Sequence, residues 1–206
     1  MREKCGLVGV RSRSGLNVLY MAIDSLRALQ HRGQEAWGFA VPGVRPFRWL
    51  GLISEEIKAA QTIAESSKSD AVIGHTRYST VGSTVFENVQ PIQIGDEFSI
   101  AHNGTISNTE ELEKLVSIDF QIPDWASDTL IVGFRLAQLL RKNNGKWFEA
   151  FSELNGEING AYCFVILDKD GKLYASRDER GFRPLCIGWH EQTESYIVAS
   201  ESCALS

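Results

Sequence analysis

The order of apolar and polar residues predicts alternating strands and helices over the first two thirds of the chain. Residues 5–10 and 37–41 are short apolar runs of the kind that form buried strands. Residues 45–51 show another strand pattern, which we expect to pair with residues 37–41 as a hairpin. Between the first two runs, apolar residues recur at helical spacing before Gly33, at Leu16, Leu19, Ile23, Leu26 and Leu29.

The middle of the chain carries further patterns of both kinds. Ser54, followed by two glutamates, is expected to cap a helix that reaches about residue 66. Residues 71–76 and 98–102 are apolar enough to be buried strands. Further helices are predicted over residues 108–116, 128–142 and 146–154.

The last quarter changes to short β-rich runs separated by turn-like polar strings, and we expect these runs to form one antiparallel meander. The runs are residues 161–167, 172–176, 184–189 and 196–200. Strands at both ends of the chain with helices between them predict an α+β fold. Its expected form is a four-layer α/β/β/α sandwich of two mostly antiparallel sheets. No internal repeat or linker divides the chain, so one domain is expected.

Composition excludes several classes of function. The chain has 206 residues, 43% of them hydrophobic and 23% charged, which is enough for one sizeable core. The net charge of −5, without a cluster of Lys and Arg, argues against a nucleic-acid-binding surface. No apolar run approaches the roughly 20 residues that span a bilayer, and the N-terminus has no apolar signal region. We therefore expect a cytoplasmic protein.

The cysteines and histidines show no metal-ligand spacing, so no metal site is predicted. Cys163 and Cys186 lie in apolar runs and are expected in the core, and Cys203 lies among polar residues near the end of the sequence. All four cysteines should be reduced thiols. Cys5 differs from the others because it begins a glycine-rich strand.

Five polar, glycine-rich strings follow apolar segments, where folds commonly present reactive groups. They are CGLVGV, LQHRGQEAWG, IGHTRYST, IAHNGT and ASDT. Each string taken alone has an ordinary structural explanation. A cysteine at a strand start is usually core, and HNG is a common turn. Their occurrence together favours a single site.

The chain resembles the glutaminase domains of amidophosphoribosyltransferases, which belong to the N-terminal-nucleophile (class II) glutamine amidotransferases. The resemblance extends over nearly the whole sequence, and glucosamine-phosphate synthases are less similar after Arg77. The strings that carry it are CGLVGV, LRALQHRGQE, GHTRYSTVGS, ENVQPI, AHNGTISNTEEL, SDT, GAYCFVIL, RDERGFRPL and VASESCAL. The resemblance implies the N-terminal-nucleophile hydrolase fold.

The resemblance also implies a catalytic mechanism. Cys5 would supply the thiolate, and the free α-amino group of the same residue would act as the base, since its ordinary pKa of roughly 8 lies near neutral pH. Asn103, through its side-chain amide, and Gly104, through its backbone N–H, match the family's oxyanion hole. His31, His75 and His102 are expected to support neighbouring loops.

L-Glutamine is the substrate that the resemblance implies. Arg77 matches the residue that binds the α-carboxylate, and Asp128 matches the acceptor for the α-ammonium group. Thr80 is expected to add a hydroxyl contact. Arg32 and Gly33 fall in a loop that closes over glutamine in the family, although a helix end with a glycine cap would explain them as well. No cofactor is expected in this chain.

The sequence departs from the family pattern at both ends. Met1 to Lys4 precede Cys5, and an amide nitrogen is not a base, so we expect residues 1–4 to be a propeptide. The glutaminase domain would then be residues 5–206, with no phosphoribosyltransferase domain present. We expect a stand-alone subunit or isolated domain. Its ammonia would pass to phosphoribosyl diphosphate on a Mg-dependent phosphoribosyltransferase partner, in the first step of purine synthesis.

Other readings of the sequence stay open. The chain could be a non-catalytic regulatory or scaffold subunit of the same fold, or a glutaminase serving a different synthase. A self-processing peptidase is weakened by the pair Arg77 and Asp128, which suits an amino-acid head group. A sheet edge after residues 196–200 is expected to be covered by a partner. The sequence leaves the oligomeric state open.

Overall fold

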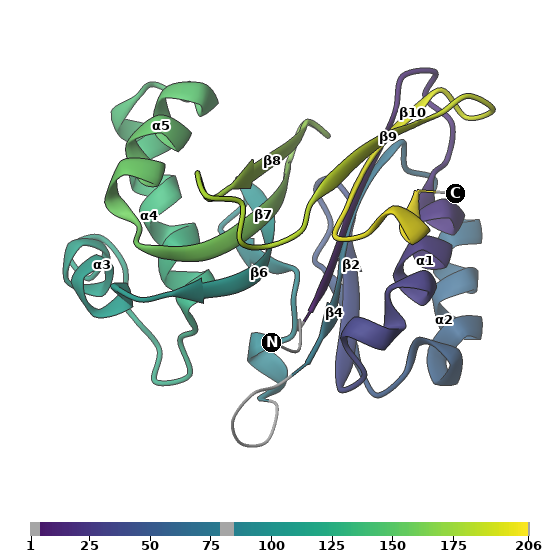
Figure 1. The fold of residues 1–206 in the computed structure, drawn as a ribbon, viewed down its shortest axis with the longest axis horizontal. Helices are drawn as coiled ribbons and strands as arrows, with labels where there is room; N and C mark the ends of the chain where they lie inside the picture. Colours follow the sequence, from purple (N-terminus) through teal and green to yellow (C-terminus); the bar gives the residue numbers. More distant parts are fainter. Residues whose placement is uncertain (1–4, 79–84, 206) are drawn as a thin grey trace.

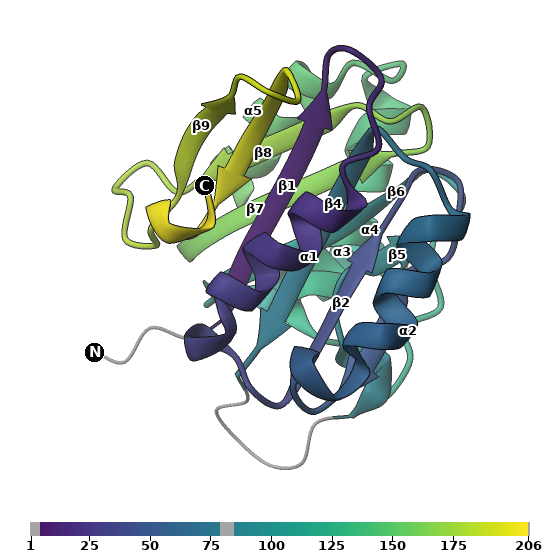
Figure 2. The same ribbon diagram turned by 90° about the vertical axis from the view of Figure 1, so that its right-hand side faces the viewer.

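The computed structural model describes residues 5–78 and 85–205. Two antiparallel sheets pack face to face, with helices on both outer faces, which confirms the predicted four-layer sandwich (Figure 1). The larger sheet has the order β3-β2-β4-β1-β10-β9 and the smaller has the order β5-β6-β7-β8. The helices α1 and α2 cover the outer face of the larger sheet (Figure 2). The helices α3, α4 and α5 lie outside the smaller sheet (Figure 1).

Most elements lie where the sequence predicts them. The strands of the larger sheet are β1 (Gly6–Ser12), β2 (Ala36–Ala40), β3 (Phe47–Leu50), β4 (Ala71–Arg77), β9 (Cys186–His190) and β10 (Ser195–Ala199). The strands of the smaller sheet are β5 (Ile92–Ile94), β6 (Phe98–Ile106), β7 (Gly160–Asp168) and β8 (Leu173–Arg177). The helices are α1 (Leu19–Ala28), α2 (Ile53–Ser66), α3 (Thr109–Val116), α4 (Asp128–Lys142) and α5 (Trp147–Glu157). The short 3-10 helices are η1 (Gln30–Arg32), η2 (Phe86–Asn88) and η3 (Ser202–Ala204).

Strand β1 lies in the middle of the molecule and is buried on both faces. Leu7 belongs to the core between the two sheets, whereas Val8 and Val10 belong to the core beneath α1 and α2. A side chain at Gly9 would lie 2.7 Å from Val165 in the opposite sheet, so the glycine lets the sheets approach closely. The alternation along β1 therefore places Leu7 and Gly9 on the side that faces the smaller sheet.

Helix α4 lies against the outer face of the smaller sheet. Nine of its residues are buried, which explains why its broad apolar pattern is recognisable in the sequence. Asp128 in the first turn and Arg141 and Lys142 in the last turn have the charges that stabilise the helix dipole. The Asp128 carboxylate also accepts the backbone N–H of Ile106, which fixes the beginning of α4 beside the end of β6.

The prediction of one terminal meander is wrong. The strands β7 and β8 pair in the smaller sheet, whereas β9 and β10 pair in the larger one. The carboxylate of Asp178 accepts backbone N–H groups of Arg180 and Phe182, which turns the chain after β8 instead of continuing the same sheet. The expected edge at residues 196–200 is also wrong, because β10 lies between β1 and β9.

Two smaller predictions differ from the structure as well. Helix α2 begins at Ile53, so Ser54 is not its cap, and the Glu55 carboxylate instead accepts the backbone N–H of Leu52 at 2.9 Å. The HNG string is not a turn, because Asn103 and Gly104 lie within β6, paired with β7. Among the described residues, no helix is long and apolar enough to cross a membrane.

Candidate active site

Cys5 lies directly before β1 and is the centre of the candidate site. Its backbone φ is +73°, in the left-handed region that costs a residue other than glycine about 1–2 kcal/mol. The thiol Sγ lies 3.8 Å from the carbonyl oxygen of Tyr78, the residue after β4. The start of one strand and the end of its neighbour thus meet around the sulfur.

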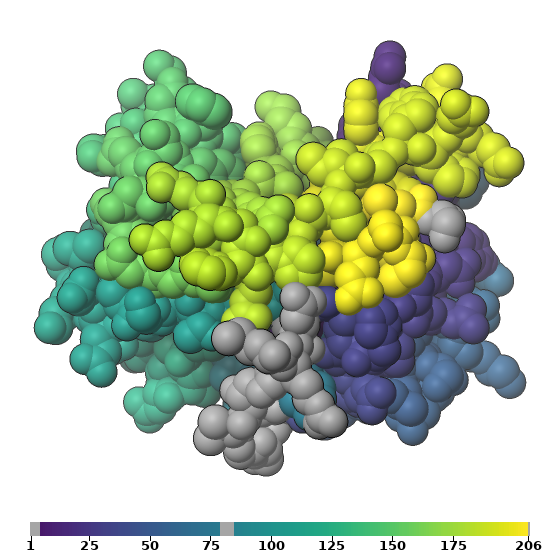
Figure 3. Space-filling view, in the orientation of Figure 1, coloured from purple at the N-terminus to yellow at the C-terminus, as the bar shows by residue number. Residues whose placement is uncertain are grey.

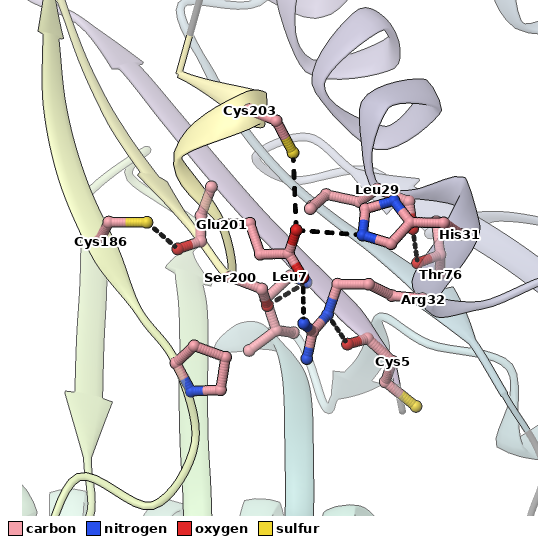
Figure 4. Close-up of polar contacts among 12 residues, drawn as sticks. Cys5, Leu7, Leu29, His31, Arg32, Thr76, Cys186, Ser200, Glu201 and Cys203 are labelled. Carbon is pink, nitrogen blue, oxygen red and sulfur yellow. Dashed lines mark hydrogen bonds and ion pairs between the residues drawn. The ribbon is translucent and has the colours of Figure 1, made fainter. Parts of the chain in front are cut away.

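Arg32 holds both backbone polar groups of Cys5. The Cys5 nitrogen donates to the Arg32 carbonyl oxygen at 3.1 Å, and the Arg32 Nε donates to the Cys5 carbonyl oxygen at 2.8 Å. Arg32 itself is only 2% exposed, and its Nη1 donates to the carboxylate of Glu201 (Figure 4). These contacts fix the cysteine in its unusual conformation.

Charged groups around Cys5 act in opposite directions on its thiol. Burial raises the pKa of Cys5, and the contact with Tyr78 and the positive charges of Arg77 and Arg32 lower it. The negative charge of Asp128 raises it again. A thiolate at Cys5 would therefore be stabilised by the positive charges of Arg77 and Arg32 and destabilised by the negative charge of Asp128.

Arg77 is the last residue of β4. Its Nη1 donates to the carbonyl oxygen of Asn88 at 3.2 Å, whereas its buried Nε has no hydrogen-bond partner in the part of the chain that the structure describes. A guanidinium with unused donors is suited to bind a carboxylate.

Asp128 is the first residue of α4 and is ionised at neutral pH. Its carboxylate accepts the backbone N–H of Thr129 at 2.7 Å and that of Ile106 at 3.4 Å, and it lies 3.7 Å from Nδ1 of His102. Burial opposes ionisation, but His102 and the two N–H groups lower the pKa of Asp128 to about 2. A fixed anion in this place is suited to bind an ammonium group.

Asn103 and Gly104 lie side by side in β6. Asn103 is 1% exposed and sits opposite Cys163 of the core between the sheets, so its side chain faces the larger sheet. Its Nδ2 is buried without a hydrogen-bond partner among residues 5–78 and 85–205. Gly104 has a φ of +148°, and a Cβ there would collide with the Ala161 carbonyl oxygen, so only glycine fits.

Two of the three histidines that were expected to support neighbouring loops, His102 and His31, contact site residues outside their own segments. His102 bonds Thr129 at 3.1 Å and contacts Asp128, so it supports the start of α4. His31 contacts Glu201 beside Arg32. His75 is fully buried, and burial together with the charges of Arg77 and His102 lowers its pKa to about 3, so its ring is neutral.

Some predicted site residues keep an untested role. Thr80 lies outside the described residues, as do residues 1–4. Arg32 points to Cys5 and Glu201, and the role of Arg32 and Gly33 in covering glutamine stays a prediction. Gly33 has an extended backbone and is not a left-handed cap; a Cβ there would lie 2.6 Å from the backbone nitrogen of Arg77.

Among the residues that the structure describes, no three or more His, Cys, Asp and Glu side chains form a group that could hold a metal ion, and the absence of a metal stays a prediction. The residues that sequence reasoning missed are Glu201, Thr129 and Gln90. Gln90 accepts the backbone N–H of His102 at 2.6 Å and donates to Thr129 at 3.0 Å. The strings ENVQPI and VASESCAL already contain Gln90 and Glu201, but nothing local in them indicates a role.

Comparison with known proteins shows which family the chain belongs to. Residues 75–206 match the family model described as glutamine amidotransferase domain. The chain belongs to this family. Most of the site residues lie within the matched range, namely Arg77, Asn103, Gly104 and Asp128.

Individual relatives agree with the family model. The amidophosphoribosyltransferase of Methanocaldococcus jannaschii is 35% identical over 98% of this chain, and that of Pyrococcus horikoshii is 37% identical over 100% of this chain. The chain covers 43% and 44% of these two relatives. A solved glutamine phosphoribosylpyrophosphate amidotransferase from B. subtilis, complexed with ADP and GMP, has a TM-score of 0.79 and 29% identity. That match covers 97% of this amidotransferase domain and 42% of the solved chain.

Proposed function

We propose that this amidotransferase domain hydrolyses L-glutamine to glutamate and ammonia, with Cys5 as the nucleophile. The observation that carries the proposal is the pair of opposite charges that act on the Cys5 thiol, the positive charge of Arg77 and the negative charge of Asp128. A free amino-acid head group has a carboxylate and an ammonium group. A cation and an anion near one thiol suit that pair of charges.

The proposed reaction proceeds through a thioester. The α-amino group of Cys5 takes the thiol proton, and the sulfur attacks the side-chain amide carbon of glutamine. The negative charge that develops on the amide oxygen is stabilised by Nδ2 of Asn103 and the N–H of Gly104. Ammonia leaves with the proton from the amine, and water then cleaves the thioester to release glutamate and the thiol.

Substrate binding is assigned to the charged pair. Arg77 holds the α-carboxylate through its unused donors, and Asp128 holds the α-ammonium group. Thr80 adds a hydroxyl contact, and the segment with Arg32 and Gly33 covers the bound glutamine. Because Asp128 stays ionised far below neutral pH, binding of the ammonium group does not depend on its titration in that range.

The mature domain is proposed to begin at Cys5, with residues 1–4 removed. Only then is the α-nitrogen an amine with an available lone pair. The Cys5 nitrogen donates to the Arg32 carbonyl oxygen at 3.1 Å, and the same contact would orient the free amine.

The ammonia is proposed to pass to phosphoribosyl diphosphate on a phosphoribosyltransferase, as the names of the relatives suggest. That step would be the first of purine synthesis, and the transferase would use Mg. We place the reaction in the cytoplasm, in keeping with the four cysteines, which are all free thiols.

Glutamate release from glutamine tests the proposal directly. Protein that begins at Cys5 should release glutamate, and the Cys5→Ala variant should not. A Cys163→Ala variant is the control, because that buried thiol lies in the core between the sheets. No glutamate from the processed wild type would favour a regulatory or scaffold role. Release by Cys5→Ala at the wild-type rate would exclude Cys5 as the nucleophile.

A further inference from the structure

The carboxylate of Glu201 contacts Arg32, the residue that holds the backbone of Cys5. One of its oxygens accepts a hydrogen bond from Arg32 Nη1, and the other lies 3.0 Å from Nε2 of His31 (Figure 4). Glu201 follows β10, in the late part of the chain that runs across both halves of one molecular face (Figure 3). Arg32 donates two hydrogen bonds, one to the Glu201 carboxylate and one to the Cys5 carbonyl oxygen, and so links this carboxylate to the backbone of the nucleophile.

Arg32 is suited to transmit the position of Glu201 to Cys5. Its side chain is long and would lose considerable rotamer entropy on ordering, so it stays in one place only if its far end is held. Glu201 holds that end, and Arg32 Nε is then fixed 2.8 Å from the Cys5 carbonyl oxygen. Cys5 has a positive φ of 73°, which its own conformational preference opposes, so its orientation depends on such contacts.

His31 fixes the second oxygen of Glu201. Its Nδ1 lies 3.0 Å from the carbonyl oxygen of Ala28, and its Nε2 lies 3.0 Å from the Glu201 carboxylate. Both partners are acceptors, so each ring nitrogen lies where it can donate a hydrogen bond. Burial opposes ionisation of Glu201, but Arg32 and His31 lower its pKa. The carboxylate is thus held as an anion between the Arg32 guanidinium and the His31 ring.

We propose that Glu201 is a positioning residue for the proposed glutamine hydrolysis, on which this inference rests. It anchors the Arg32 guanidinium, and Arg32 holds the Cys5 backbone so that the thiol and the α-nitrogen face each other. Glu201 contacts Arg32, His31 and Cys203, whereas glutamine is assigned to Arg77 and Asp128. Because the segment with Arg32 and Gly33 is also proposed to cover glutamine, loss of Glu201 should lower kcat much more than it raises KM.

The test compares Glu201→Ala and Glu201→Gln in full chains that begin at Cys5. We expect kcat for glutamate release to fall roughly 10- to 100-fold in Glu201→Ala, as for a displaced catalytic group. Gln keeps one oxygen for Arg32 but loses the charge, so its kcat should lie between those of the wild type and Glu201→Ala. In both variants any rise in KM should be smaller than the fall in kcat.

A second readout reports on the nucleophile without glutamine. Iodoacetamide alkylates thiolates, and mass mapping of the modified peptide gives the rate at Cys5 alone. The positive charge of Arg32 lowers the pKa of Cys5, so a mobile Arg32 should shift the pH profile of alkylation to higher pH. A merely structural role for Glu201 would leave this profile unchanged.

Glu157→Ala is the matched control. Glu157 accepts two hydrogen bonds from Arg135, at 2.6 and 2.7 Å, and its exposed fraction of 30% is close to the 33% of Glu201. The Glu157→Ala variant should lose stability without any change in kcat or in the pH profile of Cys5 alkylation.

The outcomes separate the two proposals. A wild type that releases no glutamate defeats the proposed function itself. An active wild type with Glu201→Ala indistinguishable in kcat from Glu157→Ala overturns the positioning role. If Glu201→Ala fails to fold, Glu201→Gln decides, because wild-type kcat with an unshifted alkylation profile in that variant also overturns it.

Discussion

At the scale of single residues, Asp128 is the clearest case of a charge set by its surroundings. Its side chain is 29% exposed, and burial alone would favour the neutral acid. The N–H groups of Thr129 and Ile106 and the ring of His102 reverse that preference, so that the pKa falls to about 2. These three groups are available only in the folded chain, which makes the ionisation of Asp128 a contribution to stability.

The stabilising effect of Asp128 should disappear in acid. Because its folded pKa lies below the ordinary value of 3.8, the contribution is complete above that value and is lost as the pH falls from about 4 to 2. Asp128→Asn lacks this contribution, so its urea midpoint should change less than that of the wild type over this range. Asp124→Asn, at an exposed position on the preceding loop, should follow the wild type. Equal slopes for Asp128→Asn and the wild type would contradict the assignment.

Gly104 should tolerate no side chain. Alanine there would adopt a strained φ of +148° and would meet the Tyr162 Cα at 2.8 Å as well as the Ala161 carbonyl. We expect a loss of more than about 2 kcal/mol in the free energy of unfolding, since a collision adds to the backbone strain. Chemical denaturation gives the value.

Gly43→Ala is the control for Gly104→Ala. Gly43 has a φ of +69° and no heavy atom within 4 Å of a built Cβ, so alanine there meets backbone strain alone. Its loss should be about 1–2 kcal/mol. A Gly104→Ala protein as stable as Gly43→Ala would mean that β6 and β7 can separate at this point without cost.

Individual site residues were predictable only where a family motif names them. Cys5, Arg77 and Asp128 were singled out in this way, and in the structure the charges of Arg77 and Asp128 act on the Cys5 thiol. Glu201 could not be found by the same route. Its role depends on a contact with Arg32, 169 positions earlier, and no local property of the string SESCAL indicates that contact.

At the scale of elements, β1 is tied to the segment after β10. Ser200 Oγ accepts the backbone N–H of Leu7 at 2.9 Å, and its own N–H donates to the Leu7 carbonyl oxygen at 3.0 Å. The side chain thus completes the pairing of β1 where the regular register of β10 ends. Since Leu7 lies two residues after Cys5, this contact also fixes the start of the strand beside the site.

Ser200→Ala should destabilise the protein by leaving a buried donor without a partner. Ser200 is 1% exposed, so water does not replace the lost oxygen. We expect a loss of about 1–3 kcal/mol in the free energy of unfolding. Ser66→Ala, which removes an exposed hydroxyl at the end of α2, should stay within about 0.5 kcal/mol of the wild type. A Ser200→Ala protein as stable as Ser66→Ala would show that β1 does not need this bond.

Elements were predictable from periodicity, but their assignment to sheets was not. The hairpin of β2 and β3 and the helix α4 follow from local patterns. The crossing of the chain from β8 to β9 depends on the Asp178 carboxylate and on the pairing of β9 with β10, and neither has a periodic signature. Strand β5 has three residues, which is too short for an alternation to be recognised.

At the scale of the whole molecule, the two sheets bring residues from distant parts of the sequence to one thiol. Cys5 lies at the start of the chain, Arg77 at the end of β4 and Asp128 at the start of α4. The family membership accounts for the fold and for a glutamine amidotransferase domain. These two relatives are more than twice as long as this chain, which covers 43% and 44% of them.

The N-terminus provides the decisive test at this scale. With residues 1–4 attached, the Cys5 nitrogen is an amide and still donates to the Arg32 carbonyl oxygen, but it has no lone pair for the thiol proton. General-base catalysis contributes about 100- to 10,000-fold, so the unprocessed chain should be at least about 100-fold slower in glutamate release than the chain that begins at Cys5. Intact mass defines each form, and equal melting temperatures would show that both are folded. Equal turnover of the two forms would mean that another group takes the proton, and the free-amine mechanism would be wrong.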